Sequence, residues 1–170
     1  MHLIDTTEVS PGILLDILNE RINFLLNSNN FIGSDGMDLT LISINSNKRI
    51  ITYSGAKSTF LLNSGKEWME FKTDKTSIGQ YIKKGTFNFE THTLTYKSGD
   101  SIYLYTDGFP DQYSEVDHKR IGSKRFKSKI QEIATLQMEK QKNSMDDFFI
   151  QHKKTALQTD DITLIAIKLA

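Results

Sequence analysis

The distribution of strand and helix signals along the chain constrains the fold more than any other sequence feature. Residues 39–105 contain short segments rich in β-branched and aromatic residues, separated by turn residues such as Asn, Ser and Gly. Helical periodicity occurs before this stretch and again between residues 124 and 154. Because the strands are grouped apart from the helices, we expect an α+β fold in layers rather than alternating βαβ units.

The first helix is predicted to begin after Ser10, a good N-cap, with Pro11 at its first position, and to end at about Asn27. No linker rich in Pro, Gly or Ser interrupts the chain, so we expect a single domain over residues 1–170. The predicted strands are Leu39–Ile44, Arg49–Tyr53, Thr59–Leu62, Trp68–Phe71, Phe87–Thr93, Ile102–Tyr105 and Ile162–Leu169. The predicted later helices are Lys124–Leu136 and Met145–Lys154.

Composition excludes several kinds of partner and chemistry. The 21 basic and 21 acidic residues balance, which argues against nucleic acid or an anionic membrane as a partner. The sequence has no apolar run of the roughly 20 residues that a membrane span needs, and its start does not resemble a signal peptide. With no cysteine, disulfides, thiolate metal sites and cysteine nucleophiles are excluded. We therefore expect a cytoplasmic location.

Two carboxylates stand at the ends of predicted buried strands. Asp107 follows Ile102–Tyr105 and is followed by Gly108, which lets backbone or a ligand approach closely, and Asp160 precedes the last strand. Carboxylate oxygens favour hard divalent cations such as Mg²⁺ or Mn²⁺, so the pattern indicates metal-assisted hydrolysis. Taken singly, however, Asp-Gly pairs are common in hairpins, and Asp160-Asp161 is also compatible with a solvated loop.

The two motifs together are more specific than either alone. Residues 99–109 resemble the segment Gly-Asp, an apolar run, then Ser/Thr-Asp-Gly of the stage II sporulation protein E-type phosphatases, in the metal-dependent serine/threonine protein phosphatase superfamily. Residues 160–165 resemble the Asp-Asp-Ile/Met-Thr segment of the same family, and the order agrees. Weaker similarities lie at residues 35–41, 53–56 and 77–79, so the resemblance runs from about Ser10 to the end of the sequence.

The resemblance implies an α-β-β-α sandwich, of which this chain forms a part, made of two antiparallel sheets with flanking helices. It implies a two-metal site in which Asp107 and Asp160 are ligands and Mn²⁺ or Mg²⁺ activates a water for attack on phosphoserine or phosphothreonine. Gly108, Asp111 and Asp161 are further candidates, with Asp161 expected to position the turn. The implied substrate is a phosphorylated regulator, such as an anti-sigma-factor antagonist, under control of a sensor or regulatory domain.

One expected motif is not found. The family places further metal ligands in an Asp-x-x-Gly-His-Gly segment and on an early strand, before its long helix, and this sequence contains neither. We therefore interpret the chain as the C-terminal part of the phosphatase domain, with impaired hydrolysis and a tendency to self-associate. The alternative is a non-catalytic binding or regulatory module with a phosphatase-like fold. A structural domain with no site is the third interpretation.

Overall fold

The computed structural model of the protein describes residues 9–28, 36–79 and 88–170. The chain divides into two compact units, which are described separately. The N-terminal unit is Met1–Asp100 with Leu169–Ala170, and the C-terminal unit is Ser101–Lys168. Within the described residues, no helix combines the length and the apolar character needed to cross a membrane.

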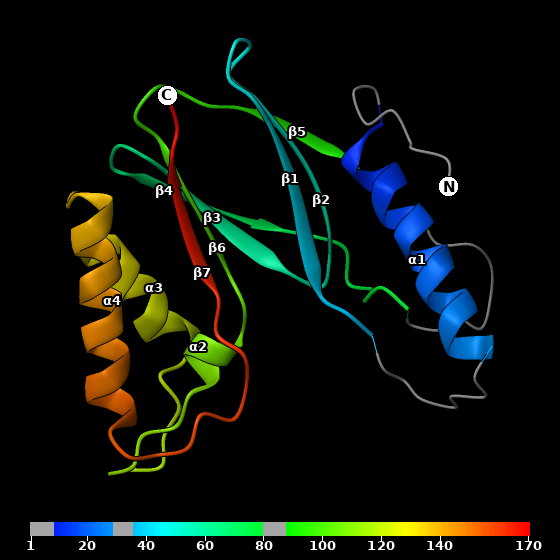
Figure 1. Cartoon of the computed structure of the whole chain (residues 1–170). Coiled ribbons are helices and arrows are strands. Elements are labelled where there is room, and N and C mark those ends of the chain that lie inside the picture. Colours follow the sequence, from blue (N-terminus) through cyan, green and yellow to red (C-terminus); the bar gives the residue numbers. More distant parts are fainter. Residues whose placement is uncertain (1–8, 29–35, 80–87) are drawn as a thin grey trace. The chain divides into compact units, whose positions relative to one another are not determined.

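The N-terminal unit contains a three-stranded antiparallel sheet and one long helix (Figure 1). Helix α1 begins where the sequence predicts, because the amide of Leu14 donates to the carbonyl of Ser10 at 3.1 Å. In the sheet, β2 lies between β1 and β5. Leu15 of α1 is buried with Ala56, Ile78 and Phe89, so the apolar stripe of the helix supplies part of this unit's core. The elements are α1 (Pro11–Ser28), β1 (Leu39–Asn45), β2 (Ile50–Ala56) and β5 (His92–Thr95).

A hairpin made of β3 (Thr59–Ser64) and β4 (Glu67–Lys72) completes the described strands of the N-terminal unit. Aromatic side chains join this hairpin to the three-stranded sheet. The ring of Tyr53 lies edge-on to Phe60 at 4.9 Å between centroids, and Phe60 stacks on Phe71 at 5.0 Å. These rings fill the space between the two layers, as offset and edge-to-face aromatic pairs do in protein cores.

The C-terminal unit is built on one antiparallel strand pair. Strands β6 (Ser101–Tyr105) and β7 (Leu164–Lys168) pair from Ser101 opposite Lys168 to Tyr105 opposite Leu164. Helices α2 (Gly108–Asp111), α3 (Ser123–Ile133) and α4 (Met138–Lys153) follow β6 and lead back to β7. The strands thus come from opposite ends of this unit's sequence, with all its helices between them (Figure 1).

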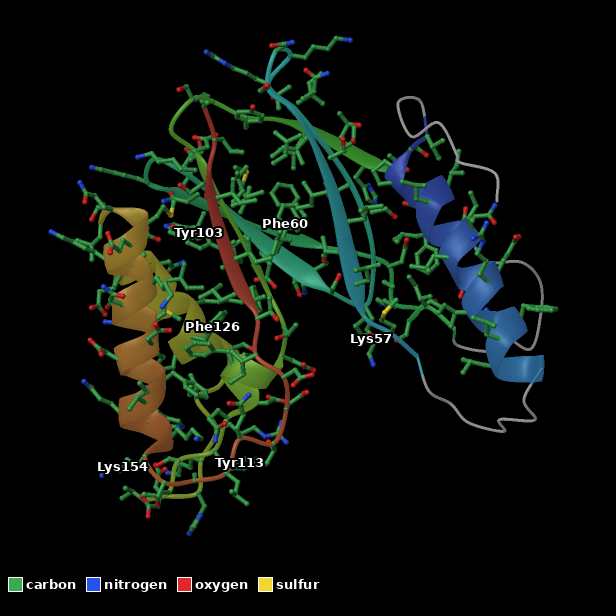
Figure 2. The ribbon with its side chains drawn as sticks, viewed as in Figure 1. Lys57, Phe60, Tyr103, Tyr113, Phe126 and Lys154 are labelled. Atoms are coloured by element: carbon green, nitrogen blue, oxygen red, sulfur yellow. The ribbon has the colours of Figure 1, made fainter. Side chains whose placement is uncertain are left out.

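Phe126 of α3 is the centre of the aromatic core in the C-terminal unit (Figure 2). Its ring centroid lies 4.9 Å from that of Phe109 in α2 and 4.8 Å from that of Tyr105 in β6. Phe109 also contacts Phe149 of α4, with 5.1 Å between centroids. The short helix that follows Asp107 is therefore held by side chains from both longer helices.

The segment before β5 differs from the prediction. The strand predicted as Phe87–Thr93 is observed as His92–Thr95, and Phe87 lies outside the described residues. The preceding residues bond to α1 instead: the amide of Phe89 donates to Asp16 at 2.8 Å, and the hydroxyl of Thr91 accepts from the amide of Gly12 at 2.8 Å. These bonds to α1 occur where the prediction placed strand pairing.

The prediction for α4 was wrong at its start. The helix was predicted from Met145 and begins at Met138, with Gln141 only 3% exposed. Gln141 can be buried because its amide nitrogen donates to the carbonyls of Ala134 and Leu136 and its oxygen accepts from the hydroxyl of Tyr103. A hydrogen-bonded glutamine occupies a position where the apolar pattern requires a hydrophobic residue.

Candidate functional site

The end of β6 and the start of β7 lie side by side, which brings the two Asp motifs to the same edge of the strand pair. The last ladder pair is Tyr105 with Leu164. Pairing continues one step further, because the amide of Thr106 donates to the carbonyl of Thr163 at 3.0 Å. Asp107 therefore leaves β6 next to the segment that carries Asp160 into β7.

The Thr106 hydroxyl ties these two segments together. It donates to the carbonyl oxygen of Asp161 at 3.0 Å and accepts from the amide of Thr163 at 2.9 Å. One side chain thus bonds to backbone groups on both sides of Ile162. Sequence reasoning did not assign a role to Thr106, although the Ser/Thr position of the motif was recognised.

Gly108 allows the close approach of the two motifs. A Cβ atom at this position would collide with the carbonyl oxygen of Asp161, and would lie 3.1 Å from its carbonyl carbon and 3.3 Å from the Cβ of Asp160. The two nearest of these atoms are backbone, which cannot move aside cheaply. Glycine at position 108 is required because the turn after β6 packs directly on the Asp160-Asp161 backbone.

Asp107 and Asp160 are both solvent-exposed. Asp107 precedes the first residue of α2 and makes no side-chain capping hydrogen bond there. One carboxylate oxygen of Asp160 accepts from the amide of Asp161 at 2.7 Å, and the Asp160 carbonyl accepts from the side chain of Gln158 at 2.9 Å. The backbone of the Asp160 turn is thus fixed, and a second carboxylate oxygen is left for a ligand.

The other two acidic candidates have different surroundings. The amide of Asp111 donates to the carbonyl of Asp107 at 2.9 Å, one turn earlier, but its carboxylate forms an ion pair with Arg120 at 3.1 Å. Arg120 is held in turn by Tyr113, whose hydroxyl accepts from its Nε at 2.9 Å. Asp161 contributes its amide and its carbonyl to the turn, as described above.

The two aspartates offer carboxylate oxygens, which are the kind of ligand that a hard divalent cation prefers. Mg²⁺ and similar ions use oxygen ligands, often one or two carboxylates, and keep several waters. Asp107 and Asp160 supply two such carboxylates at one strand edge. Across the described part of the chain, no group of three or more His, Asp or Glu side chains lies close enough together to hold a metal ion. The described residues therefore offer part of a coordination sphere.

Comparisons with known proteins agree with this geometry. The model of the family described as Stage II sporulation protein E matches residues 1–170. No curated protein matches the sequence. Among solved structures, the chain is similar to the SiaA-PP2C domain of Pseudomonas aeruginosa, with a TM-score of 0.81 and 22% identity. That match covers 95% of this chain and 61% of the SiaA-PP2C chain.

Two further structures have the same fold at lower identity. The phosphatase domain of SpoIIE from Bacillus subtilis matches with a TM-score of 0.59 and 15% identity, over 98% of this chain and 76% of that one. The catalytic domain of the serine/threonine protein phosphatase PstP, solved with two manganese ions, matches with a TM-score of 0.66 and 12% identity. That match covers 95% of this chain and 73% of the PstP chain. The predicted α+β class, with antiparallel sheets and flanking helices, is confirmed.

Proposed function

Because the chain belongs to the stage II sporulation protein E family, we propose that it forms the C-terminal part of a metal-dependent protein serine/threonine phosphatase domain. The single observation that carries the proposal is the meeting of Asp107 and Asp160 across Thr106 and Gly108. The two carboxylates would hold a Mn²⁺ or Mg²⁺ ion. When bound, such an ion activates water for attack on a phosphoryl group and stabilises charge on its oxygens.

The chain's own residues have distinct roles in this proposal. Asp107 and Asp160 bind, while Thr106 and Gly108 keep their backbones at the distance that lets both carboxylates reach one ion. Asp111 is a further candidate ligand, but its carboxylate would have to break the ion pair with Arg120 before it could bind a metal ion. The proposed substrate is a phosphoserine or phosphothreonine on a cytoplasmic regulatory protein. We propose an anti-sigma-factor antagonist as such a substrate, and a sensor or regulatory domain as the part that controls the phosphatase.

A second candidate is a non-catalytic module that binds a phosphoprotein without turning it over. It is favoured by the small number of acidic and histidine side chains that come together in the described residues. For the same reason, we propose that hydrolysis by this chain alone is weak. Self-association stays a prediction.

Calorimetric titration with Mn²⁺ tests the site, with turnover of p-nitrophenyl phosphate measured in parallel. We expect the wild-type chain to bind, and Asp107→Asn and Asp160→Asn each to weaken binding about tenfold or more, because each removes one charged ligand. Asp147→Asn, an exposed carboxylate of α4, is the matched control and should bind as the wild type does. Binding with turnover supports the phosphatase, binding without turnover supports the second candidate, and equal binding by all four proteins rejects the site.

A further inference from the structure

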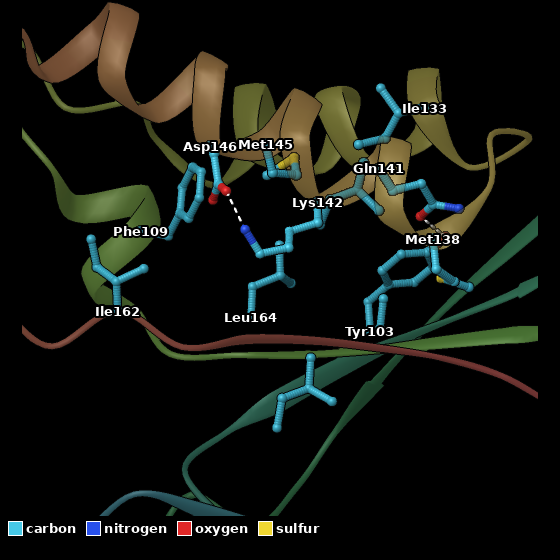
Figure 3. Close-up of a pocket in the computed structure, with 13 residues that line it drawn as sticks. Tyr103, Phe109, Ile133, Met138, Gln141, Lys142, Met145, Asp146, Ile162 and Leu164 are labelled. Atoms are coloured by element: carbon cyan, nitrogen blue, oxygen red, sulfur yellow. Dashed lines mark hydrogen bonds and ion pairs between the residues drawn. The ribbon is translucent and has the colours of Figure 1, made fainter.

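A pocket of about 500 Å³ lies inside the C-terminal unit, between the β6–β7 pair and the helices (Figure 3). Its floor includes Tyr103 of β6 and Ala166 of β7, which are partners in the strand ladder. Helices α3 and α4 form the opposite wall. This volume is in the range of protein sites that bind small molecules, which are roughly 300–1,000 Å³.

The lining of the pocket is mainly apolar and partly adaptable. Side chains from α2, α3, α4 and β7 contribute carbon surface: Phe109, Ile130, Ile133, Met138, Met145 and Leu164. The two methionines have unbranched, polarizable side chains that adjust to the shape of a ligand, and an aromatic ring among them favours aromatic ligands. The surface therefore suits an apolar molecule better than water.

The polar groups of the pocket are already paired with one another. The Tyr103 hydroxyl donates to the Gln141 oxygen at 3.0 Å, and the Gln141 nitrogen donates to the carbonyls of Ala134 and Leu136. The Lys142 ammonium donates to Asp146 at 2.6 Å, as the dashed line in Figure 3 shows. A charged ligand would lose its hydration against the mainly apolar lining, so the lining selects against charge.

We propose that this pocket binds a small uncharged apolar molecule, of the size of one substituted aromatic ring. Such a ligand would bury apolar surface against the methionines, Phe109 and Leu164 without leaving a polar group unpaired. The pocket stands independently of the proposed phosphatase activity, because neither its volume nor its lining involves the Asp107 or Asp160 side chain.

The position of the pocket gives a ligand a way to act on the candidate site. Phe109 lies two residues after Asp107, and Ile162 lies two residues after Asp160, and both line the pocket. A molecule bound there contacts both segments that carry the candidate ligands. If the proposed metal site is correct, an apolar ligand and the metal ion should alter each other's affinity by the same factor.

Methyl NMR on methionine-labelled protein tests the proposal directly, since Met138 and Met145 line the pocket while the other three methionines, Met1, Met37 and Met69, belong to the other unit. The probe is toluene, with benzoate as the charged probe of similar size. We expect saturable shifts of the Met138 and Met145 methyl signals with toluene and no shift of the other three. Benzoate should bind at least about tenfold more weakly than toluene. Unsaturable shifts, or equal shifts of all five signals, would overturn the proposal.

A variant that fills the pocket gives the second test. Ala166→Leu should weaken toluene binding about tenfold, in line with the effect of added methylene groups in apolar sites. Ala170→Leu adds the same atoms outside the pocket and should leave binding unchanged. Should Ala166→Leu disturb the spectrum of the free protein, Met138→Phe fills the pocket from α4, with Met145 as reporter. Wild-type affinity in the filled variant rejects the pocket as the binding site.

Discussion

The hydroxyl of Thr106 bonds to the carbonyl oxygen of Asp161 at 3.0 Å, and this contact joins the end of one strand to the start of the other. Because the same hydroxyl accepts from the amide of Thr163, its position is fixed by two backbone groups. Asp107 follows Thr106, and Asp160 precedes Asp161. The side chain that we propose aligns the two candidate ligands is therefore uncharged and is bonded to backbone groups of the second segment.

Replacing Thr106 with Val removes both hydrogen bonds and keeps the β-branched shape. We expect the free energy of unfolding to fall by about 1 kcal/mol, the usual net value for such bonds, and Mn²⁺ affinity to fall with it. Urea unfolding and calorimetry measure the two effects. Thr106→Ser keeps the hydroxyl and should restore most of both. Equal Mn²⁺ affinity in Thr106→Val and wild type would show that the bridge does not align the carboxylates.

Gly108→Ala tests the close approach of the two motifs. The added methyl group would collide with the Asp161 carbonyl, so we expect a loss of about 1–3 kcal/mol in unfolding free energy and a marked loss of Mn²⁺ binding. Gly99→Ala is the control: Gly99 has open space around it but a φ of 91°, so alanine strains only the backbone there. That variant should lose some stability and keep its Mn²⁺ affinity. The prediction fails if both variants bind Mn²⁺ equally well.

His152, in the last turn of α4, is only 8% exposed. Its Nδ1 lies 3.2 Å from a guanidinium nitrogen of Arg125, which can only donate, so Nε2 carries the proton. Nε2 then donates toward the carbonyls of Gln112 and Lys119 at 3.2 and 3.1 Å. The ring ties α4 to both ends of the segment that follows α2.

Replacing His152 with Phe keeps the ring volume and removes the donor to both carbonyls. We expect a loss of about 1 kcal/mol in unfolding free energy, because the hydrogen bond from the ring is lost while each carbonyl keeps a backbone amide as donor. Urea unfolding gives the value, and amide hydrogen exchange of residues 112–120 shows whether the loss is local. His92→Phe, at a half-exposed position of β5, is the control and should change stability less. An unchanged exchange rate in residues 112–120 would contradict the role of the ring.

Strand ends and their motifs could be predicted from the sequence because they depend on local apolar runs. Both Asp107 and Asp160 follow or precede such runs, and the observed β6 and β7 lie within one or two residues of the predicted strands. The juxtaposition of the two motifs required the family resemblance, since strand pairing across about sixty residues is not a local property. No local pattern indicates that Arg120 would pair with Asp111.

The buried polar residues account for the main errors. Gln141 and His152 occupy interior positions because hydrogen bonds from other elements satisfy them. Hydrophobic periodicity does not mark Gln141 as an interior residue, and this is why α4 was predicted to start seven residues late. The partners of these side chains become apparent only when the fold is known.

Alkaline pH should destabilise the protein through Tyr103. Burial raises the pKa of this tyrosine above its ordinary value of 10.0, more than its hydrogen bonds with Gln141 and Ser101 lower it. The folded state therefore binds the phenolic proton more tightly than the unfolded state. The resulting stability is fully present below pH 10 and is lost as the pH rises through the folded-state pKa.

Urea unfolding of wild type and Tyr103→Phe at pH 8 and pH 11 measures this contribution. At pH 8 the variant should be less stable by about 1 kcal/mol, because the hydrogen bond to Gln141 is lost. Between pH 8 and pH 11 the wild type should lose more stability than the variant. Some loss should remain in the variant, because burial also raises the pKa of Tyr53. Parallel curves for the two proteins would mean that the Tyr103 hydroxyl ionises as freely in the folded chain as in the unfolded one, and that the pocket floor is open to water.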